Sequence, residues 1–135
     1  MKVNFEKTLS PCVCNEVILW HIAHGFVWNV REVSGRYIGV FYATLLCGDG
    51  VIVHFSNVPG IPISAASVFS AFKKGVRIVS PLGVVFATIP ESKPKLISAA
   101  CRLGFVRTSA AFHRFGDGNI ALLKFLNNEN AILKE

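Results

Sequence analysis

The sequence has few charged side chains, only 16% of its 135 residues, and it lacks an apolar run long enough to cross a membrane. A spanning helix needs roughly 18 or more consecutive apolar residues. The longest candidate, residues 17–28, is interrupted by His21, His24 and Gly25. Residues 1–7 also lack the apolar core and small-residue cleavage site of a secretory signal. These absences argue against a membrane or secreted protein and predict a cytoplasmic one.

Cysteine is scarce as well, with four residues, of which only Cys12 and Cys14 are close together. A structural zinc site usually needs two closely spaced ligand pairs. His21 and His24 are the nearest second pair, but Cys12 and His21 would lie more than two helical turns apart. The spacing therefore predicts reduced thiols and no metal site.

Internal repeats, low-complexity tracts and linkers are also missing, so residues 1–135 are expected to form one domain. The 52% hydrophobic content excludes a disordered chain and is compatible with an apolar surface buried in a homodimer. The net charge of +6 favours an anionic partner. However, the closest basic cluster, Lys73, Lys74 and Arg77, is not interleaved with aromatics, which argues against a nucleic-acid partner.

The first part of the chain predicts a short extended segment followed by two helices and a hairpin. Ser10 and Pro11 are typical of a helix start, and apolar residues then recur at helical spacing as far as Gly25. Residues 26–33 are expected to form a second short helix. Residues 37–46 and 51–58 are apolar and β-branched, and the Gly and Asp residues between them predict a tight hairpin turn.

The second part predicts a helix on each side of a buried strand, and then a final hairpin. Ser64 is expected to cap a helix over residues 65–74, with Gly75 near its end. The continuous apolar run 84–89 predicts a parallel strand buried on both faces. Ser92 is expected to cap a helix that stops at Gly104. The remaining elements are strands at 105–115 and 120–126, a turn at 116–119, and a polar tail or closing helix at 127–135.

This order resembles the GNAT (N-acetyltransferase) superfamily, and the resemblance covers nearly the whole chain. Its most specific support is the end of the last long helix, Arg102, Leu103, Gly104 and Phe105, which is similar to the family's basic residue, Leu-like residue and Gly-Phe. The sequence looks most like the small divergent GNAT-like proteins of bacteriophages and prophages. The resemblance implies an α/β (α+β) fold, in which a mixed central sheet has antiparallel hairpins at both ends, a parallel βαβ crossover and helices on both faces.

The resemblance also implies acetyl-CoA as cofactor, and it assigns residues to it. The backbone of Ser64, Ala65 and Ala66 would bind the pyrophosphate at a helix N-terminus. Ser56 and Asn57 would bind the pantetheine arm where two parallel strands separate, and the 3′-phosphate would contact Arg102 or the pair Lys73–Lys74.

The sequence departs from the family pattern at several of its functional positions. Ile61 and Ser64 replace a polar residue and a glycine of the cofactor loop. Pro94 stands where an Asn is frequent, and Ala100 stands where the family often has a Tyr acid. These departures weaken the case for activity more than the case for the fold.

His54 is the candidate catalytic base, because an imidazole titrates near neutral pH and the matching family strand lines the acyl channel. A hydrogen-bonded, partly buried structural histidine is the alternative reading. Other candidate bases are Glu16, Glu32 and Glu91. The function implied is acetyl transfer to a small-molecule or peptide amine. Two alternatives remain: a catalytically degenerate phage or virion-associated binding or structural protein, and a small basic nucleic-acid-associated factor, which only the charge supports.

Overall fold

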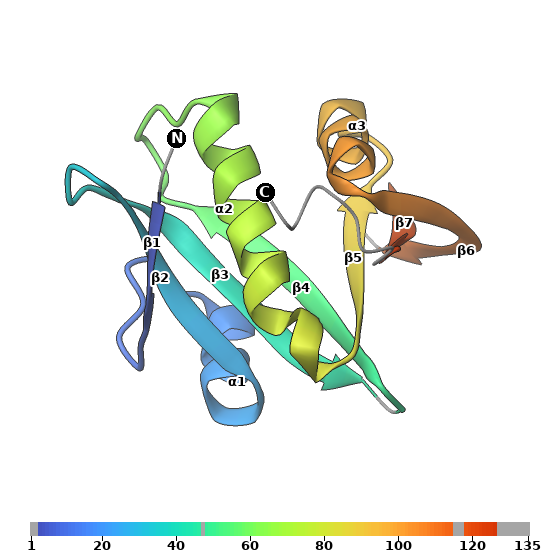
Figure 1. Cartoon of the computed structure of the whole chain (residues 1–135), viewed down its shortest axis with the longest axis horizontal. Helices are drawn as coiled ribbons and strands as arrows, with labels where there is room; N and C mark the ends of the chain where they lie inside the picture. Colours follow the sequence, from blue (N-terminus) through green and yellow to red (C-terminus); the bar gives the residue numbers. More distant parts are fainter. Residues whose placement is uncertain (1–2, 47, 115–117, 127–135) are drawn as a thin grey trace.

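A seven-stranded mixed sheet forms the centre of the protein (Figure 1). The computed structural model describes residues 3–46, 48–114 and 118–126, and the elements below belong to those ranges. The strands are β1 Val3–Lys7, β2 Phe26–Glu32, β3 Tyr37–Leu46, β4 Gly50–Asn57, β5 Val84–Pro90, β6 Phe105–Arg114 and β7 Gly118–Phe125. The helices are α1 Glu16–His24, α2 Ala65–Val79 and α3 Pro94–Leu103, and a short 3-10 helix, η1, spans Ser80–Leu82.

The strands follow the spatial order β1-β2-β3-β4-β5-β7-β6. Only the central pair, β4 and β5, is parallel; α2 connects these two strands, and the neighbouring pairs on both sides are antiparallel. The predicted mixed sheet with hairpins at both ends and one parallel crossover is therefore confirmed. The helices cover both faces, as predicted, with α2 and α3 on one face and α1 on the other.

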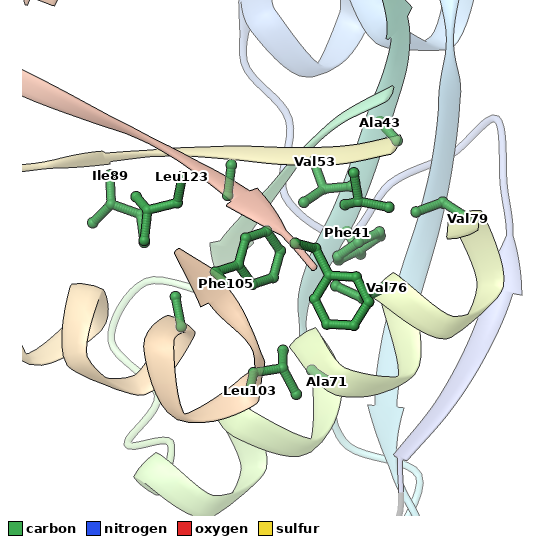
Figure 2. Close-up of a cluster of buried hydrophobic side chains, with 14 of the residues drawn as sticks. Phe41, Ala43, Val53, Ala71, Val76, Val79, Ile89, Leu103, Phe105 and Leu123 are labelled. Atoms are coloured by element: carbon green, nitrogen blue, oxygen red, sulfur yellow. The ribbon is translucent and has the colours of Figure 1, made fainter. Parts of the chain in front are cut away.

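Most of the core lies between the sheet and the helices α2 and α3. Figure 2 shows Phe41, Val53 and Phe105 of the strands meeting Val76 of α2 and Leu103 of α3, and all five side chains are buried. A smaller cluster lies on the opposite face, where Ile18 of α1 packs with three residues of β2 and β3: Val27, Val40 and Tyr42.

The strand β5 is buried on one face only, which corrects the prediction that both faces are buried. Val85, Ala87 and Ile89 point into the core, whereas Phe86 and Thr88 on the other face are only half-buried. The reason is that α1 packs against β2 and β3 and does not extend over β5. A continuous apolar run does not distinguish a strand covered on both faces from one whose outer face remains partly open.

The prediction of a helix at residues 26–33 is wrong, because this segment is the strand β2. It pairs with β1 on one side and β3 on the other. Its side chains alternate, so that Val30 joins the main core while Val27 joins the cluster under α1. Such two-residue periodicity is typical of a strand with both faces in contact.

The start of the first helix was also predicted wrongly. It begins at Glu16 instead of Pro11, and its cap is Asn15, whose side chain accepts a hydrogen bond from the backbone of Ile18 at 2.9 Å. Residues 8–15 instead run as an irregular segment fastened to β2. There the amide of Asn29 bonds to the backbone of Ser10 and Cys12, at 3.2 and 2.8 Å.

The boundaries of α2 and α3, the two helices beside the site, differ in part from the sequence prediction. Ser64 caps α2 as predicted, but the helix continues through Gly75 to Val79. The helix α3 begins at Pro94 after Lys93, which makes no side-chain capping bond, so Ser92 is not its cap; it ends at Gly104 as predicted. Of the predicted turn 116–119, residues 116 and 117 lie outside the described residues, as do residue 115 and the predicted tail 127–135, while Gly118 and Asn119 begin β7. None of the helices in the described ranges combines the length and apolarity that crossing a membrane requires.

Candidate functional site

The parallel strands β4 and β5 separate halfway along their length. Gly50–Val53 pair with Val84–Ala87, but from Thr88 onward β5 pairs only with β7. Beyond Val53 the strand β4 therefore has β3 as its only neighbour in the described sheet. The helices α2 and α3 both begin at this end of the sheet, because each follows the carboxyl end of one of the two strands (Figure 1). In open α/β sheets, ligands bind at such a place.

A cavity of about 300 Å³ lies where the strands separate, between α2 and α3. Its walls are largely apolar, which matches the usual character of a small-molecule site. The lining residues are Tyr42, Val53, His54, Phe55, Asn57, Val68, Phe69, Phe72, Thr88, Ile89, Pro90, Lys93, Leu96, Ala99, Ala100 and Leu103.

His54 lines this cavity, as predicted for a residue acting on a ligand there. It lies directly across from Tyr42 in the β3–β4 ladder, and the two rings stack with centroids 5.2 Å apart. The buried ring of His21, from α1, meets both rings edge-on, at 4.8 Å from Tyr42 and 5.8 Å from His54. His54 is thus held between the cavity and a buried aromatic cluster.

Ser56 and Asn57 occupy the part of β4 beyond the pairing with β5, and they take different roles. Asn57 lines the cavity, and its side chain donates to the carbonyl of Val58 at 3.4 Å. The side chain of Ser56 points to the opposite face of the sheet, where its Oγ lies 3.0 Å from the phenolic oxygen of Tyr42. The backbone of both residues is free of β5, which was the basis of their prediction.

The N-terminus of α2 carries the predicted residues Ser64, Ala65 and Ala66, one helical turn before the cavity-lining Val68. The Oγ of Ser64 accepts from the backbone of Ser67 at 3.1 Å. The N–H groups of Ala65 and Ala66 belong to the first turn and have no acceptor within the helix. Because alanine side chains are small, the approach to these two donors is not crowded.

An acidic side chain also lies near the start of α2. Glu32 Oε2 is 3.5 Å from the hydroxyl of Ser67. The carboxylate receives two hydrogen bonds from Arg36, at 3.0 and 3.1 Å, and these hold the pKa of Glu32 below its usual range. Arg36 therefore offsets much of this negative charge, which would otherwise oppose an anion at the same helix end.

Two cations stand at the edge of the cavity. Lys93 lines it, immediately before α3. The predicted Arg102 lies at the other end of α3, with its guanidinium over the ring of Phe69, 5.3 Å from the centroid. Phe69 is itself a lining residue, so Arg102 is one side chain away from the cavity. The predicted alternative was the pair Lys73–Lys74. Neither lysine is among the described lining residues, and Lys74 donates to the backbone oxygen of Val3 at 2.9 Å.

Sequence reasoning missed Tyr42 and Lys93. Tyr42 was detectable in principle: a hairpin that pairs Leu46 with Gly50 places residues 42 and 54 directly opposite each other. Lys93 was not, because its place at the cavity depends on how the segment between β5 and α3 folds over the separated strands, which no local pattern predicts. Ala100 lines the cavity without a hydroxyl, as its sequence position predicted. Within the ranges that the structure covers, three or more His, Cys, Asp or Glu side chains nowhere gather as a metal site would require.

No protein-family model and no curated protein matches this chain, but solved structures do. A Bacillus subtilis acetyltransferase in complex with CoA aligns with a TM-score of 0.73, covering 92% of this chain and 98% of that chain at 9% identity. A GNAT family acetyltransferase from Elizabethkingia anophelis with acetyl-CoA bound aligns with a TM-score of 0.70, covering 91% and 97% at 9% identity. A spermidine N-acetyltransferase chimera from Vibrio cholerae and hSSAT aligns with a TM-score of 0.62, covering 86% of this chain and 72% of that chain at 14% identity. The protein therefore has the GNAT fold.

Proposed function

We propose that the protein is an acyl-CoA-dependent N-acyltransferase that transfers an acetyl group from acetyl-CoA to an amine. The observation that carries this proposal is the apolar cavity between the separated ends of β4 and β5, with two helix N-termini and a lysine at its edge. An opening of this kind suits a ligand with a thin apolar arm and a polyanionic end. Two of the similar structures were solved with such a ligand, CoA or acetyl-CoA.

The residues present fit the cofactor at both of its ends. The N–H groups of Ala65 and Ala66 would receive the pyrophosphate, because first-turn donors and the helix dipole favour an anion. The backbone of Ser56 and Asn57, paired with β3 but not with β5, would hold the pantetheine amides on its open side. Arg102 and Lys93 supply positive charge near the cavity for the remaining phosphate. The cofactor would supply an activated acyl thioester.

His54 is the proposed base, since it is the one imidazole among the described lining residues. It would accept the proton that the amine loses as nitrogen bonds to the acyl carbon. The apolar wall of Phe55, Phe69 and Phe72 would keep water from competing for the acyl group. Ala100 offers no acid for the departing sulfur, so water would have to return the proton there. General acid help is typically worth roughly 10²–10⁴-fold, and turnover should therefore be slow.

The test is calorimetry and thermal unfolding with acetyl-CoA, followed by an assay of thiol release. At about 100 times Kd, a ligand specific for the folded state stabilises it by about 2.7 kcal/mol, so the melting temperature should rise clearly. Lys93→Glu and Arg102→Glu should weaken binding at least several-fold. Arg77→Glu makes the same charge change on an exposed residue at the far end of α2 and serves as the matched control.

Absence of both heat and melting shift at millimolar acetyl-CoA would refute the proposal. Binding without thiol release for any amine would instead favour the alternative of a phage-type or other GNAT-fold protein that binds its ligand without catalysis. If His54→Ala leaves thiol release unchanged, only the assignment of His54 as the base is contradicted, and the proposed acyl transfer stands.

A further inference from the structure

The cavity extends through the sheet and reaches its other face. Phe72 and Leu103 line it from the side of α2 and α3. Tyr42 and His54 line it from the opposite side, where Tyr42 belongs to the small core beneath α1. A passage between two faces is available only because β4 and β5 lose contact after Val53 and Ala87. The site therefore has a second end, on the side of α1, which a cofactor held by α2 and α3 would not fill.

Flat rings dominate this second end. Tyr42 and His54 stack at an interplanar angle of 27°, and His21 packs against both rings at 70–77°. One face of the His54 ring is covered by Tyr42, so its opposite face or its edge lines the cavity. Thr88 and Pro90 of β5 complete this end. We call Tyr42 and His54 the aromatic wall.

Acidic side chains are absent from the described residues that line the cavity. Lys93 is the only charged residue among the described residues that line the cavity. The nearest acid in sequence, Glu91, follows the lining residue Pro90 but forms an ion pair with Arg107. The chain as a whole carries a net charge of +6.

This chemistry disfavours an acceptor that carries several positive charges. A polyamine would have to leave water without carboxylates to compensate for the lost hydration. An amine attached directly to an aromatic ring avoids this penalty, because its lone pair is delocalised into the ring and it is uncharged at neutral pH. Its ring can stack against the aromatic wall with the offset that such pairs prefer.

We propose that the acceptor is a weakly basic aromatic amine, which reaches the site from the side of α1 and packs its ring against Tyr42 and His54. The inference rests on the acyl transfer proposed above. In the reaction, the amine nitrogen bonds to the thioester carbonyl carbon and the carbon–sulfur bond breaks. The proton lost by nitrogen passes through His54 and water to the departing thiolate. The products are an N-aryl amide and the free thiol, and no oxidant or reductant is needed.

The experiment compares 4-toluidine with spermidine as acceptors in the thiol-release assay, with acetyl-CoA binding measured on the same samples. The wild-type protein should show at least a tenfold higher kcat/KM with 4-toluidine. Tyr42→Leu should raise the KM for 4-toluidine roughly three- to tenfold, in line with the strength of an aromatic pair, while acetyl-CoA still binds. Tyr42→Phe should recover most of that loss, because it restores the ring.

Two further variants distinguish the loss of the Tyr42 ring from a general folding defect. Tyr37→Leu removes a tyrosine ring from the same strand, but outside the cavity, and should leave the KM unchanged. If Tyr42→Leu does not fold, His54→Leu removes the other half of the aromatic wall from a less buried position. Because this variant also removes the proposed base, its readout is the affinity for 4-toluidine in calorimetry, which should fall roughly three- to tenfold.

The outcomes separate the two proposals. A preference for spermidine, or an unchanged KM in Tyr42→Leu together with an unchanged 4-toluidine affinity in His54→Leu, overturns the aromatic acceptor while leaving acyl transfer intact. Failure to bind acetyl-CoA, together with absence of thiol release from either amine, overturns the acyl transfer and the acceptor with it.

Discussion

Phe41 is fully buried where the sheet meets α2, and its ring determines which residue the facing helix can carry at position 75. Three other aromatic rings surround it, those of Phe5, Trp28 and Phe72, with centroids 5.5–6.0 Å away. A Cβ atom on Gly75 would lie 2.3 Å from the Phe41 ring. Glycine is therefore required here by close packing, although the sequence pattern predicts it as a helix end.

Gly75→Ala should therefore destabilise the protein even though alanine favours helix. The propensity gain is about 1 kcal/mol, while overpacking a core costs about 1–3 kcal/mol and the enclosed Phe41 ring has little room to move. The two contributions leave a net loss of up to about 2 kcal/mol in urea unfolding, and the enclosed ring favours the upper part of that range. In a Phe41→Leu background the same substitution should cost less, and a double-mutant cycle measures the difference. Equal costs in both backgrounds would contradict the contact between residues 75 and 41.

At the scale of elements, local chemistry predicted some turns and the cap of α2 correctly, but it misplaced the starts of α1 and α3 and took β2 for a helix. The turn before β4 and the end of α3 follow from glycines with positive φ, Gly48 at 82° and Gly104 at 122°. Residues 26–33 were misread because their apolar pattern suits a helix or a strand with two buried faces. Only pairing with β1 and β3 decides between the two, and that pairing is not local.

Two of the serines predicted as helix caps, Ser64 and Ser92, can be compared directly by substitution. Ser64 accepts the backbone N–H of Ser67, so Ser64→Ala should cost about 1 kcal/mol of stability through the lost cap of α2. Ser92 precedes Lys93 and makes no capping bond to α3, so Ser92→Ala should change stability by less than about 0.5 kcal/mol. Chemical denaturation of the two variants measures both effects. A larger loss of stability for Ser92→Ala would contradict the start of α3 at Pro94 and indicate that Ser92 caps the helix.

At the scale of the whole molecule, the order of elements was enough to predict the fold, but only part of the site. His54 and Asn57 were placed at the cavity from a family resemblance, and both do line it. Tyr42, Phe69 and Lys93 come to the same cavity from three separate elements. Their meeting depends on how far β4 and β5 separate and on how closely α2 and α3 approach. Neither distance is encoded in a local sequence pattern, so the sequence alone could not predict which residues line the cavity together.

The position of the cofactor can be tested by hydrogen exchange of the backbone amides with and without acetyl-CoA. If the ligand enters where β4 and β5 separate, amides in residues 54–57 and at Ala65 and Ala66 should exchange more slowly. The slowing should reach about 100-fold at 100 times Kd for amides that exchange only from the free protein. Amides of β1 and the irregular segment 8–15 should be unchanged, because β2 and β3 lie between β1 and β4, and the segment is held against β2. The alternative ligand site is another hollow of about 350 Å³, whose lining includes Leu9, Ile22 and Val27. Protection confined to residues 7–9 and 22–27 would move the ligand there and remove the basis for assigning roles to Ser64, Arg102 and His54.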